Sequence, residues 1–444
     1  MPATISPLPT KGRKHLSADP LYELLRGSFE HVPDPRPDGS PISLPDALMS
    51  GLALFALKDP SLLAFDNRRH DENMKRLFHI ERVPSDTQMR TILDEANPVD
   101  LRPAFRDVFR QVQRGKALEQ FKFLNDYHLL LMDGTQYFTS EVIHCPSCLK
   151  KEHKDGRVTY SHQMLSAVLA HPDHREVLPL APEPISNGDG QSKNDCERNA
   201  AGRLLRRIRA EHAHLNFIVA EDGLASNAPH IRELQSLRMH FILGAKPGDH
   251  EFLYRRLIDE FDQDRVTVVT WKEGKKTCEI HYLNALPLNA SNQDLLVNFV
   301  GYSEYDAEGN LLKQFSWVTD LKITRRNCRE LVRAGRTRWK IENETYNTLK
   351  NQGYHFEHNF GHGKKNLAVV FAMLMMLAFL VNQVEQLCCP LFRATWSKLG
   401  SKRALWEQVR SHYQHFRCDS MRRIYEAILY ELTKNLPLPG LDSS

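Results

Sequence analysis

The stretch that decides the fold is YHLLLMDGTQYF, residues 127–138, in which an apolar run ends at an Asp-Gly pair. Two further strand-like runs follow it, RVTYSHQMLSAVLAH (157–171) and REVLPLAPEPI (175–185), separated by polar turns. The helix-like segment 195–214 comes next, and after it the short apolar run LNFIVAEDGL (215–224). This region of the chain therefore predicts an α/β unit in the order strand, strand, strand, helix, strand.

This order is that of a ribonuclease H-like core, in which the first and fourth strands lie side by side and parallel. Asp133 is expected at or near the end of the first strand, and Asp222 at the end of the fourth. Carboxylates at the C-terminal ends of neighbouring parallel strands converge on the crevice where such sheets bind ligands. Each aspartate alone is equally consistent with a simple turn, because Asp-Gly is a common turn pair.

The regions around this unit differ in their periodicity. Residues up to 122 space apolar side chains three or four apart and predict a helical N-terminal unit. Within it, segment 65–83 is rich in Arg, Lys and His, which suits phosphate contact or a solvated connector. We expect five regions: a helical, DNA-binding domain over residues 1–122, the core in two segments over 123–246 and 316–390, a β-rich insertion over 247–315, and a helical tail over 391–444.

Composition predicts a globular protein of several units. The 444 residues are 41% hydrophobic, and the net charge of +4 is too small to indicate a nucleic-acid partner unless basic residues cluster locally. Eight cysteines, two of them adjacent, without a secretory segment predict a reducing cytoplasm. The apolar run Leu367–Val381 is shorter than the roughly 20 residues of a membrane-spanning helix. It predicts a buried helix and no membrane partner.

A local basic cluster lies where the chain returns to helix. From residue 322 to 340 the chain carries Lys322, Arg325, Arg326, Arg329, Arg333, Arg336, Arg338 and Lys340. In the stretch RTRWKIENETYNTLK (336–350), Arg338 and Glu342 are four residues apart and share a helix face. Glu342 adds a third acid to the aspartate pair. Three carboxylates can hold two divalent metals roughly 4 Å apart for an in-line displacement at phosphorus, while arginine and lysine position the anionic backbone.

Three motifs in this order, LMDGT, VAEDGLASN and RWKIENETYNTLKNQGYHFEHNFGHG, resemble the DDE transposases of bacterial insertion sequences. The last resembles the Tyr-Arg-Glu-Lys signature group, whose pattern is Y-x2-R-x3-E-x6-K in a helix. The resemblance spans about residues 126–387 and is weaker across the helical N-terminal unit. It implies a catalytic triad of Asp133, Asp222 and Glu342 that binds Mg²⁺ or Mn²⁺ as two ions.

The resemblance also implies DNA contacts. Its arginine falls on Arg338, and its lysine on Lys350, which stands one residue late and leaves Glu344 open as the third ligand. Gly335 stands at the tyrosine position. Further expected DNA contacts are Arg333, Arg336 and Trp339, where base stacking by the tryptophan competes with core packing.

The implied activity is cut-and-paste transposition by a cytoplasmic, nucleoid-associated protein. Hydrolysis frees a 3′-hydroxyl that attacks the other strand to form a hairpin and later attacks target DNA. The partners are terminal inverted repeats and target DNA, held by a homodimer to which the tail 391–444 contributes, unless that tail packs on its own core. The insertion 247–315 resembles the one that handles the hairpin and the flipped base. The alternatives are a metal-dependent nuclease that does not join DNA, and a transposase-derived DNA-binding protein.

HCPSCLKKEH, residues 144–153, forms one more constellation, in the turn between the first two core strands. Cys145 and Cys148 have CxxC spacing, with His144 and His153 nearby, so these four side chains are candidate ligands of a structural Zn²⁺. A pair of reduced thiols is the alternative. His162, on the second strand, is expected to be a packed core histidine or a phosphate contact.

Overall fold

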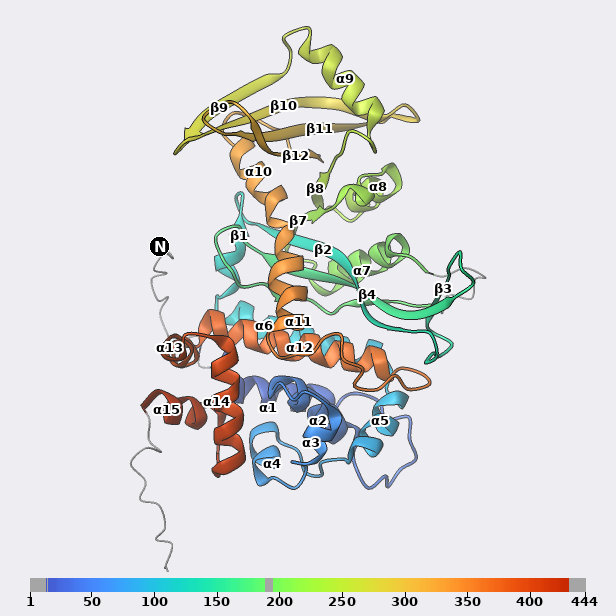
Figure 1. Ribbon diagram of the computed structural model, residues 1–444, viewed down its shortest axis with the longest axis vertical. Coiled ribbons are helices and arrows are strands. Elements are labelled where there is room, and N and C mark those ends of the chain that lie inside the picture. The colour runs from blue at the N-terminus through green and yellow to red at the C-terminus, as the bar shows by residue number, and fades with distance from the viewer. Residues whose placement is uncertain (1–12, 14, 188–194, 431–444) are drawn as a thin grey trace, which may run out of the picture.

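The computed structural model describes residue 13, residues 15–187 and residues 195–430. It is a mixed α/β protein in which helices from both ends of the chain lie together below one long sheet (Figure 1). The described strands form a 12-stranded sheet in the order β3-β4-β2-β7-β8-β12-β11-β10-β9, with β1 beside β2 and with β5 and β6 beside β4. The predicted α/β class is therefore confirmed, and the sheet places the candidate site.

The N-terminal helices follow from their capping residues and apolar faces. Ser43 accepts a hydrogen bond from the backbone N–H of Asp46, and Ser85 forms a capping box with Gln88. The apolar helix after Ser43 is buried along almost its whole length. The helices are α1 (Ala18–Phe29), α2 (Leu44–Ala56), α3 (Leu62–Asp66), α4 (Glu72–Phe78), α5 (Asp86–Glu95) and α6 (Arg102–Arg114).

The middle of the chain builds one half of the sheet. Its elements are β1 (Lys122–Phe123), β2 (Tyr127–Ser140), β3 (Leu149–Glu152), β4 (Val158–Ala170), β5 (Leu178–Pro179), β6 (Glu183–Ile185), α7 (Glu197–Glu211), β7 (Asn216–Glu221), α8 (Ala228–Ser236) and β8 (His240–Gly244). β2 is antiparallel to β4 and parallel to β7, and β7 is parallel to β8. β2, which contains Asp133, and β7, which precedes Asp222, are therefore parallel neighbours, as the order of the elements predicts.

β2 does not end at the Asp-Gly pair, so the expectation that Asp133 closes the strand or opens a turn is wrong. The strand continues to Ser140 because β4 pairs with it as far as Tyr160. Only the parallel pairing with β7 stops early, at Leu131 opposite Ala220. Asp133 thus lies inside a strand, just beyond the point where its parallel neighbour ends.

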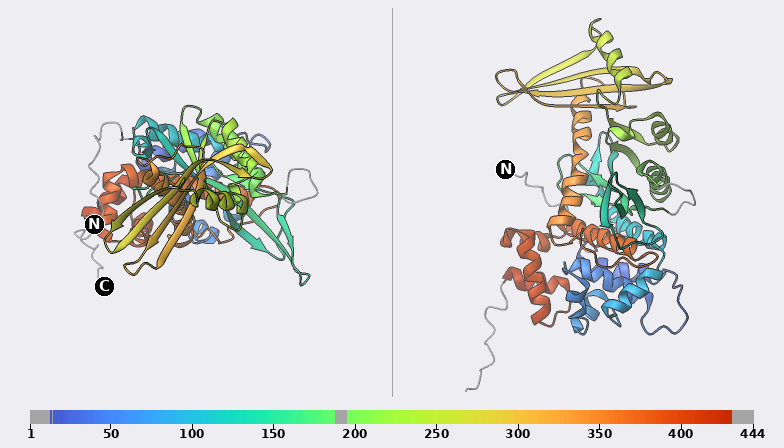
Figure 2. Two further views of the ribbon diagram at one scale, coloured as in Figure 1. Left: turned by 90° about the horizontal axis from the view of Figure 1, so that it is seen from above. Right: turned by 45° about the vertical axis from the view of Figure 1, so that its right-hand side comes forward.

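The strand-rich region expected at 247–315 extends the same sheet. It comprises α9 (Glu251–Phe261), β9 (Thr267–Glu273), β10 (Lys276–Asn289), β11 (Asn292–Tyr305) and β12 (Leu311–Thr319). The four strands form an antiparallel meander, and β12 pairs with β8. The expected boundary at 315 therefore falls within β12, and these strands are continuous with those that carry the aspartates (Figure 2).

A helical column runs from the meander to the N-terminal helices (Figure 1). It consists of α10 (Cys328–Thr337), a π-helical stretch (Ile341–Tyr346) and α11 (Asn347–Asn351). After a connecting segment, α12 (Leu367–Cys388) is 22 residues long, beyond the 15 of its apolar run. By length and composition α12 could cross a membrane, but its most apolar window is entirely buried within the protein.

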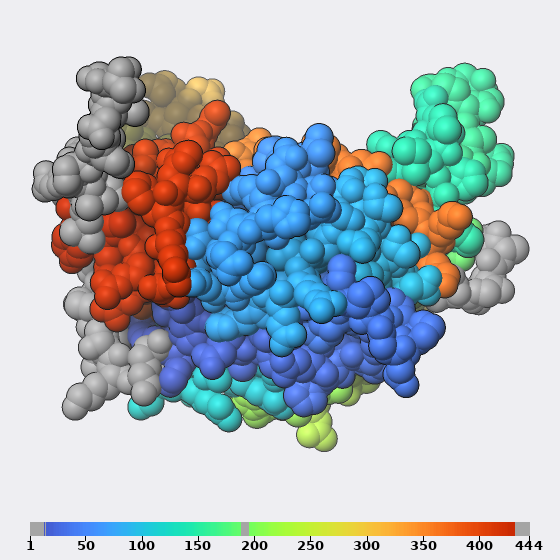
Figure 3. Space-filling model, turned by 90° about the horizontal axis from the view of Figure 1, so that it is seen from below, coloured from blue at the N-terminus to red at the C-terminus, as the bar shows by residue number. Residues whose placement is uncertain are grey.

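The last helices pack on the first ones. They are α13 (Pro390–Leu399), α14 (Lys402–His415) and α15 (Met421–Tyr430). The Asn73 amide donates to the carbonyls of Tyr413 (2.7 Å) and Phe416 (2.8 Å), and Asp19 accepts from the backbone N–H of Met421 (2.6 Å). The first and last of the described helices thus share one face (Figure 3). Residues 431–444 of the expected tail lie outside the described residues.

Candidate active site

The two aspartates occupy the same level of adjacent parallel strands. The β2–β7 register places Leu131 opposite Ala220, so Asp133 is level with Asp222 two residues further on. Asp133 is partly buried, whereas Asp222 follows β7 and accepts a hydrogen bond from the backbone N–H of Leu224 (2.9 Å). The structure therefore brings both carboxylates to the C-terminal end of the parallel strands.

Arg338 connects a third acid to this pair. Its guanidinium donates a hydrogen bond to Oε1 of Glu342 (2.8 Å), and its other terminal nitrogen lies 3.9 Å from Oδ2 of Asp133. Glu344 points elsewhere, because its Oε2 pairs with Nε of Arg175 at 3.1 Å. Of the two glutamates that the sequence leaves open, Glu342 is the one that Arg338 links to Asp133.

Glu197, which the sequence analysis does not single out, supplies a fourth carboxylate from the first turn of α7. Its side chain lies over Gly134, where an added Cβ would be 2.5 Å from Cδ of Glu197. The glycine after Asp133 thus makes room for this acid. Its signal in the sequence is only that an acidic residue opens the helix before the fourth strand, a position that the helix dipole favours in any protein.

The carboxylates act on one another. Burial raises the pKa of Asp133 to about 6, Arg338 opposes the rise, and the negative charges of Glu342, Glu197 and Asp222 add to it. Burial also raises the pKa of Glu197, with Asp222 contributing. Carboxylate oxygens are the donors that hard divalent cations such as Mg²⁺ and Mn²⁺ prefer, so the donor chemistry of these residues suits such an ion.

The π-helical stretch explains the position of the late lysine. A π-turn is closed by i→i+5 hydrogen bonds and holds one more residue than an α-turn. Lys350, eight residues after Glu342, therefore takes the helical position that the seventh residue would occupy in an uninterrupted α-helix. Its Nζ pairs with Glu357 at 2.8 Å.

Gly335, at the signature tyrosine position, lies against the indole of Trp317. A Cβ there would be 2.6 Å from Nε1 and 2.7 Å from Cδ2 of the ring, so the β12 tryptophan excludes a side chain. A tyrosine reaches the acids from another position, because the Tyr346 hydroxyl donates a hydrogen bond to the backbone carbonyl of Asp133 (2.6 Å). Packing against Trp317 thus accounts for the glycine at position 335.

The other expected DNA contacts differ in their accessibility. Arg333 and Arg336 form ion pairs with acids of the same chain, and Lys340 is buried and donates to backbone carbonyls. Trp339 is 46% exposed, so it is not a core residue. The exposed members of the basic run are Lys322, Arg325, Arg326 and Arg329.

Two clefts open on the acids. One, of about 780 Å³, is lined by Asp133, Glu197 and Asp222, together with side chains of β3 and β4. The other, of about 690 Å³, lies between β7, β8 and the meander and is lined by Asp222 and Arg338 with several aromatic rings. Asp222 borders both clefts, whereas Glu342 lines neither of them.

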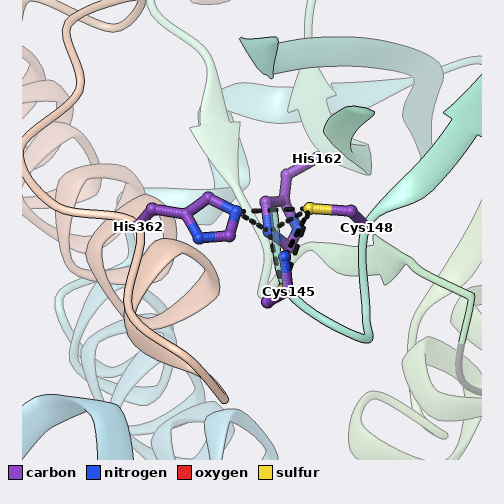
Figure 4. A group of neighbouring side chains, drawn as sticks. All are labelled: Cys145, Cys148, His162 and His362. Carbon is purple, nitrogen blue, oxygen red and sulfur yellow. Dashed lines mark hydrogen bonds between the residues drawn. The ribbon is translucent and has the colours of Figure 1, made fainter. Parts of the chain in front are cut away.

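The expected cysteines gather with different histidines. Cys145 and Cys148 meet His162 and His362, and the ligand atoms of these four buried side chains all lie within 4.8 Å of one another (Figure 4). The expected histidines lie outside the group: the ring of His144 stacks on Tyr160, and His153 hydrogen-bonds Thr159. The expected ligand set is therefore corrected to Cys145, Cys148, His162 and His362.

Comparison with known proteins gives a structural likeness. No protein-family model matches the chain, and no curated protein matches it. The solved structure of the piggyBac transposase synaptic complex with hairpin DNA is similar, with 12% sequence identity and a TM-score of 0.42. The alignment covers 97% of this chain and 88% of that chain. This likeness assigns no role to any residue described above.

Proposed function

We propose that the chain is a DDE DNA transposase with a ribonuclease H-like core, which cuts and joins DNA at the ends of an insertion sequence in the bacterial cytoplasm. The observation that carries the proposal is that Asp133 and Asp222 lie level on neighbouring parallel strands, while Arg338 contacts both Asp133 and Glu342. Their motifs and order resemble those of the Tyr-Arg-Glu-Lys group.

Each side chain has a role in this proposal. Asp133, Asp222 and Glu342 would hold two divalent cations, with Glu197 as an additional carboxylate. Bound Mg²⁺ or Mn²⁺ supplies an activated oxygen nucleophile and neutralises the leaving oxygen. In the protein alone, Arg338 is the counter-charge of Glu342 and Asp133. In the proposed DNA complex, the guanidinium of Arg338 would pair with a phosphate of the backbone.

The surroundings suit a long polyanion. The exposed residues Lys322, Arg325, Arg326 and Arg329 precede the helix of the third acid and would contact the DNA backbone. The clefts on either side of Asp222 provide a path for the strand on both sides of the scissile phosphate. Binding should therefore weaken steeply with salt, because each phosphate contact releases a counterion. Two DNA ends would be held by a homodimer.

The test is cleavage and joining of labelled DNA that carries the sequences flanking the gene, with Mg²⁺ and a target plasmid. Asp133→Asn, Asp222→Asn and Glu342→Gln should reduce cleavage to background. Glu344→Gln, on the same helix but paired with Arg175, is the matched control and should still cut. Retained cleavage in the first three variants would refute the site.

The same assay separates the alternatives. Wild-type protein that cuts the ends but never joins them to the plasmid would be a nuclease. Protein that binds the ends with salt-sensitive affinity and never cuts would be a transposase-derived DNA-binding protein. Only joined product supports the proposal.

A further inference from the structure

The cluster of two cysteines and two histidines joins segments that are far apart in the chain. Cys145 and Cys148 lie in the loop between β2 and β3, and His162 lies in β4. His362 comes from the segment between α11 and α12 (Figure 4). All four side chains are at least nine-tenths buried, with exposed fractions of 8%, 3%, 2% and 7%.

The distances between the ligand atoms match those around one tetrahedral ion. With Zn–S near 2.3 Å and Zn–N near 2.0–2.1 Å, a tetrahedron requires about 3.8 Å between sulfurs, about 3.6 Å between sulfur and nitrogen and about 3.3 Å between nitrogens. The Sγ atoms of Cys145 and Cys148 are 3.8 Å apart. His162 Nε2 lies 3.5 Å and 3.4 Å from these sulfurs. His362 Nε2 lies 3.2 Å from Cys148 Sγ and 3.1 Å from His162 Nε2.

A backbone hydrogen bond orients His362 toward the cluster. Nδ1 of His362 lies 2.9 Å from the carbonyl oxygen of Gly363, so this nitrogen carries the proton and Nε2 presents its lone pair to the cluster. A backbone carbonyl that fixes the tautomer in this way is the usual partner of a metal-bound histidine. The backbone N–H of Cys145 donates a hydrogen bond to Sγ of Cys148 (3.4 Å). The sulfur separation excludes a disulfide, whose bond is about 2.05 Å.

We propose that Cys145, Cys148, His162 and His362 form a closed structural zinc site. Four protein ligands leave no open position, which is the pattern of a structural rather than a catalytic zinc. The ion would fasten the segment that follows the helix of Glu342 to the β2–β4 hairpin, which itself carries Asp133. The site is independent of the proposed activity, because its ligands are not among the acids.

The experiment measures zinc in the full-length protein purified from cells grown with zinc. We expect one zinc per chain by mass spectrometry, and loss of that zinc in Cys145→Ser, Cys148→Ser and His362→Asn. The matched controls are His144→Asn and His153→Asn, which remove the two nearby histidines outside the cluster and should keep the metal. The proposal would be overturned if the purified wild-type protein contained no zinc. It would also be overturned if the control variants lost zinc while His362→Asn kept it.

A second measurement avoids the risk that a variant fails to fold. Wild-type protein in which Co²⁺ replaces zinc should show the intense visible absorption of a tetrahedral site with thiolate ligands. Removing the metal should speed hydrogen exchange in segment 352–366, which the ion would hold, more than in α7. Octahedral cobalt spectra, or exchange in segment 352–366 that metal removal leaves unchanged, would count against the proposal.

Discussion

Gly335→Ala is expected to destabilise the protein although it improves helix propensity. An alanine in the interior of α10 should gain about 1 kcal/mol over glycine. Against this, the new methyl group would lie 2.6 Å and 2.7 Å from two atoms of the Trp317 indole, whereas carbon contacts are optimal near 3.5–4.0 Å. Trp317 is 6% exposed and lies in β12, which pairs with β8 and β11. The ring cannot move freely, so overpacking should cost up to about 3 kcal/mol and leave a net loss of about 1–2 kcal/mol.

The assay is thermal unfolding of Gly335→Ala beside a matched glycine. Gly202 lies inside α7, where an added Cβ would come no closer than 3.4 Å, to the end of the Arg206 side chain. Gly202→Ala should therefore raise the unfolding midpoint, while Gly335→Ala lowers it. Trp317→Phe combined with Gly335→Ala should recover part of the loss as a favourable coupling energy. If Gly335→Ala raises the midpoint as Gly202→Ala does, the packing explanation is refuted.

Two further predictions concern carboxylates. Asp94→Ala should lower stability by roughly 2 kcal/mol at pH 7, because Asp94 accepts backbone N–H groups from Lys364 (2.8 Å) and the next three residues at the start of α12. Burial acts to raise the pKa of Asp94, but these hydrogen bonds outweigh it and lower that pKa. The stability difference between the wild type and Asp94→Ala should therefore vanish as pH falls through the lowered pKa. Equal unfolding midpoints at pH 7 would contradict this. Burial raises the pKa of Asp133 to about 6, so the folded state favours the protonated carboxyl. The stability that this protonation contributes is lost as pH rises through that value. Asp133→Asn should therefore raise the midpoint at pH 8 in Mg²⁺-free buffer but not at pH 4, and an unchanged midpoint at pH 8 would refute the reasoning.

The approach of Asp133 and Asp222 is predictable because the sequence signal for it lies in the residues directly before each aspartate. Asp133 and Asp222 each follow an apolar run that must be buried, and burial of both runs sets their shared level in the sheet. The length of β2 is not predictable in the same way. Asp-Gly is a turn signal, but pairing with β4 as far as Ser140 overrides it. Glu197 escapes notice because an acid in a first helical turn is common for reasons unrelated to a site.

The spacing of residues along the sequence does not identify which histidines join Cys145 and Cys148 in the cluster. His162 and His362 lie 14 and 214 residues from Cys148, so their approach depends on the finished fold. His144 and His153 are nearer in sequence, but their rings make contacts of their own outside the group. The signature tyrosine position is similar, because only the fold shows that the indole of Trp317 occupies the space beside Gly335.

Because the first helices pack against the last ones, the N-terminal unit cannot complete its fold until the later part of the chain has been synthesised. Asn73 and Asp19 form their hydrogen bonds with backbone groups of residues 413–422, and α2 packs against α12. Because roughly 300 residues separate the N-terminal unit from α15, a ribosome adding about 5–20 residues per second needs about 15–60 s to supply these partners. The N-terminal unit therefore completes its fold only after residues 413–422 have been synthesised, and a chain that stops before them should be a substrate for proteases.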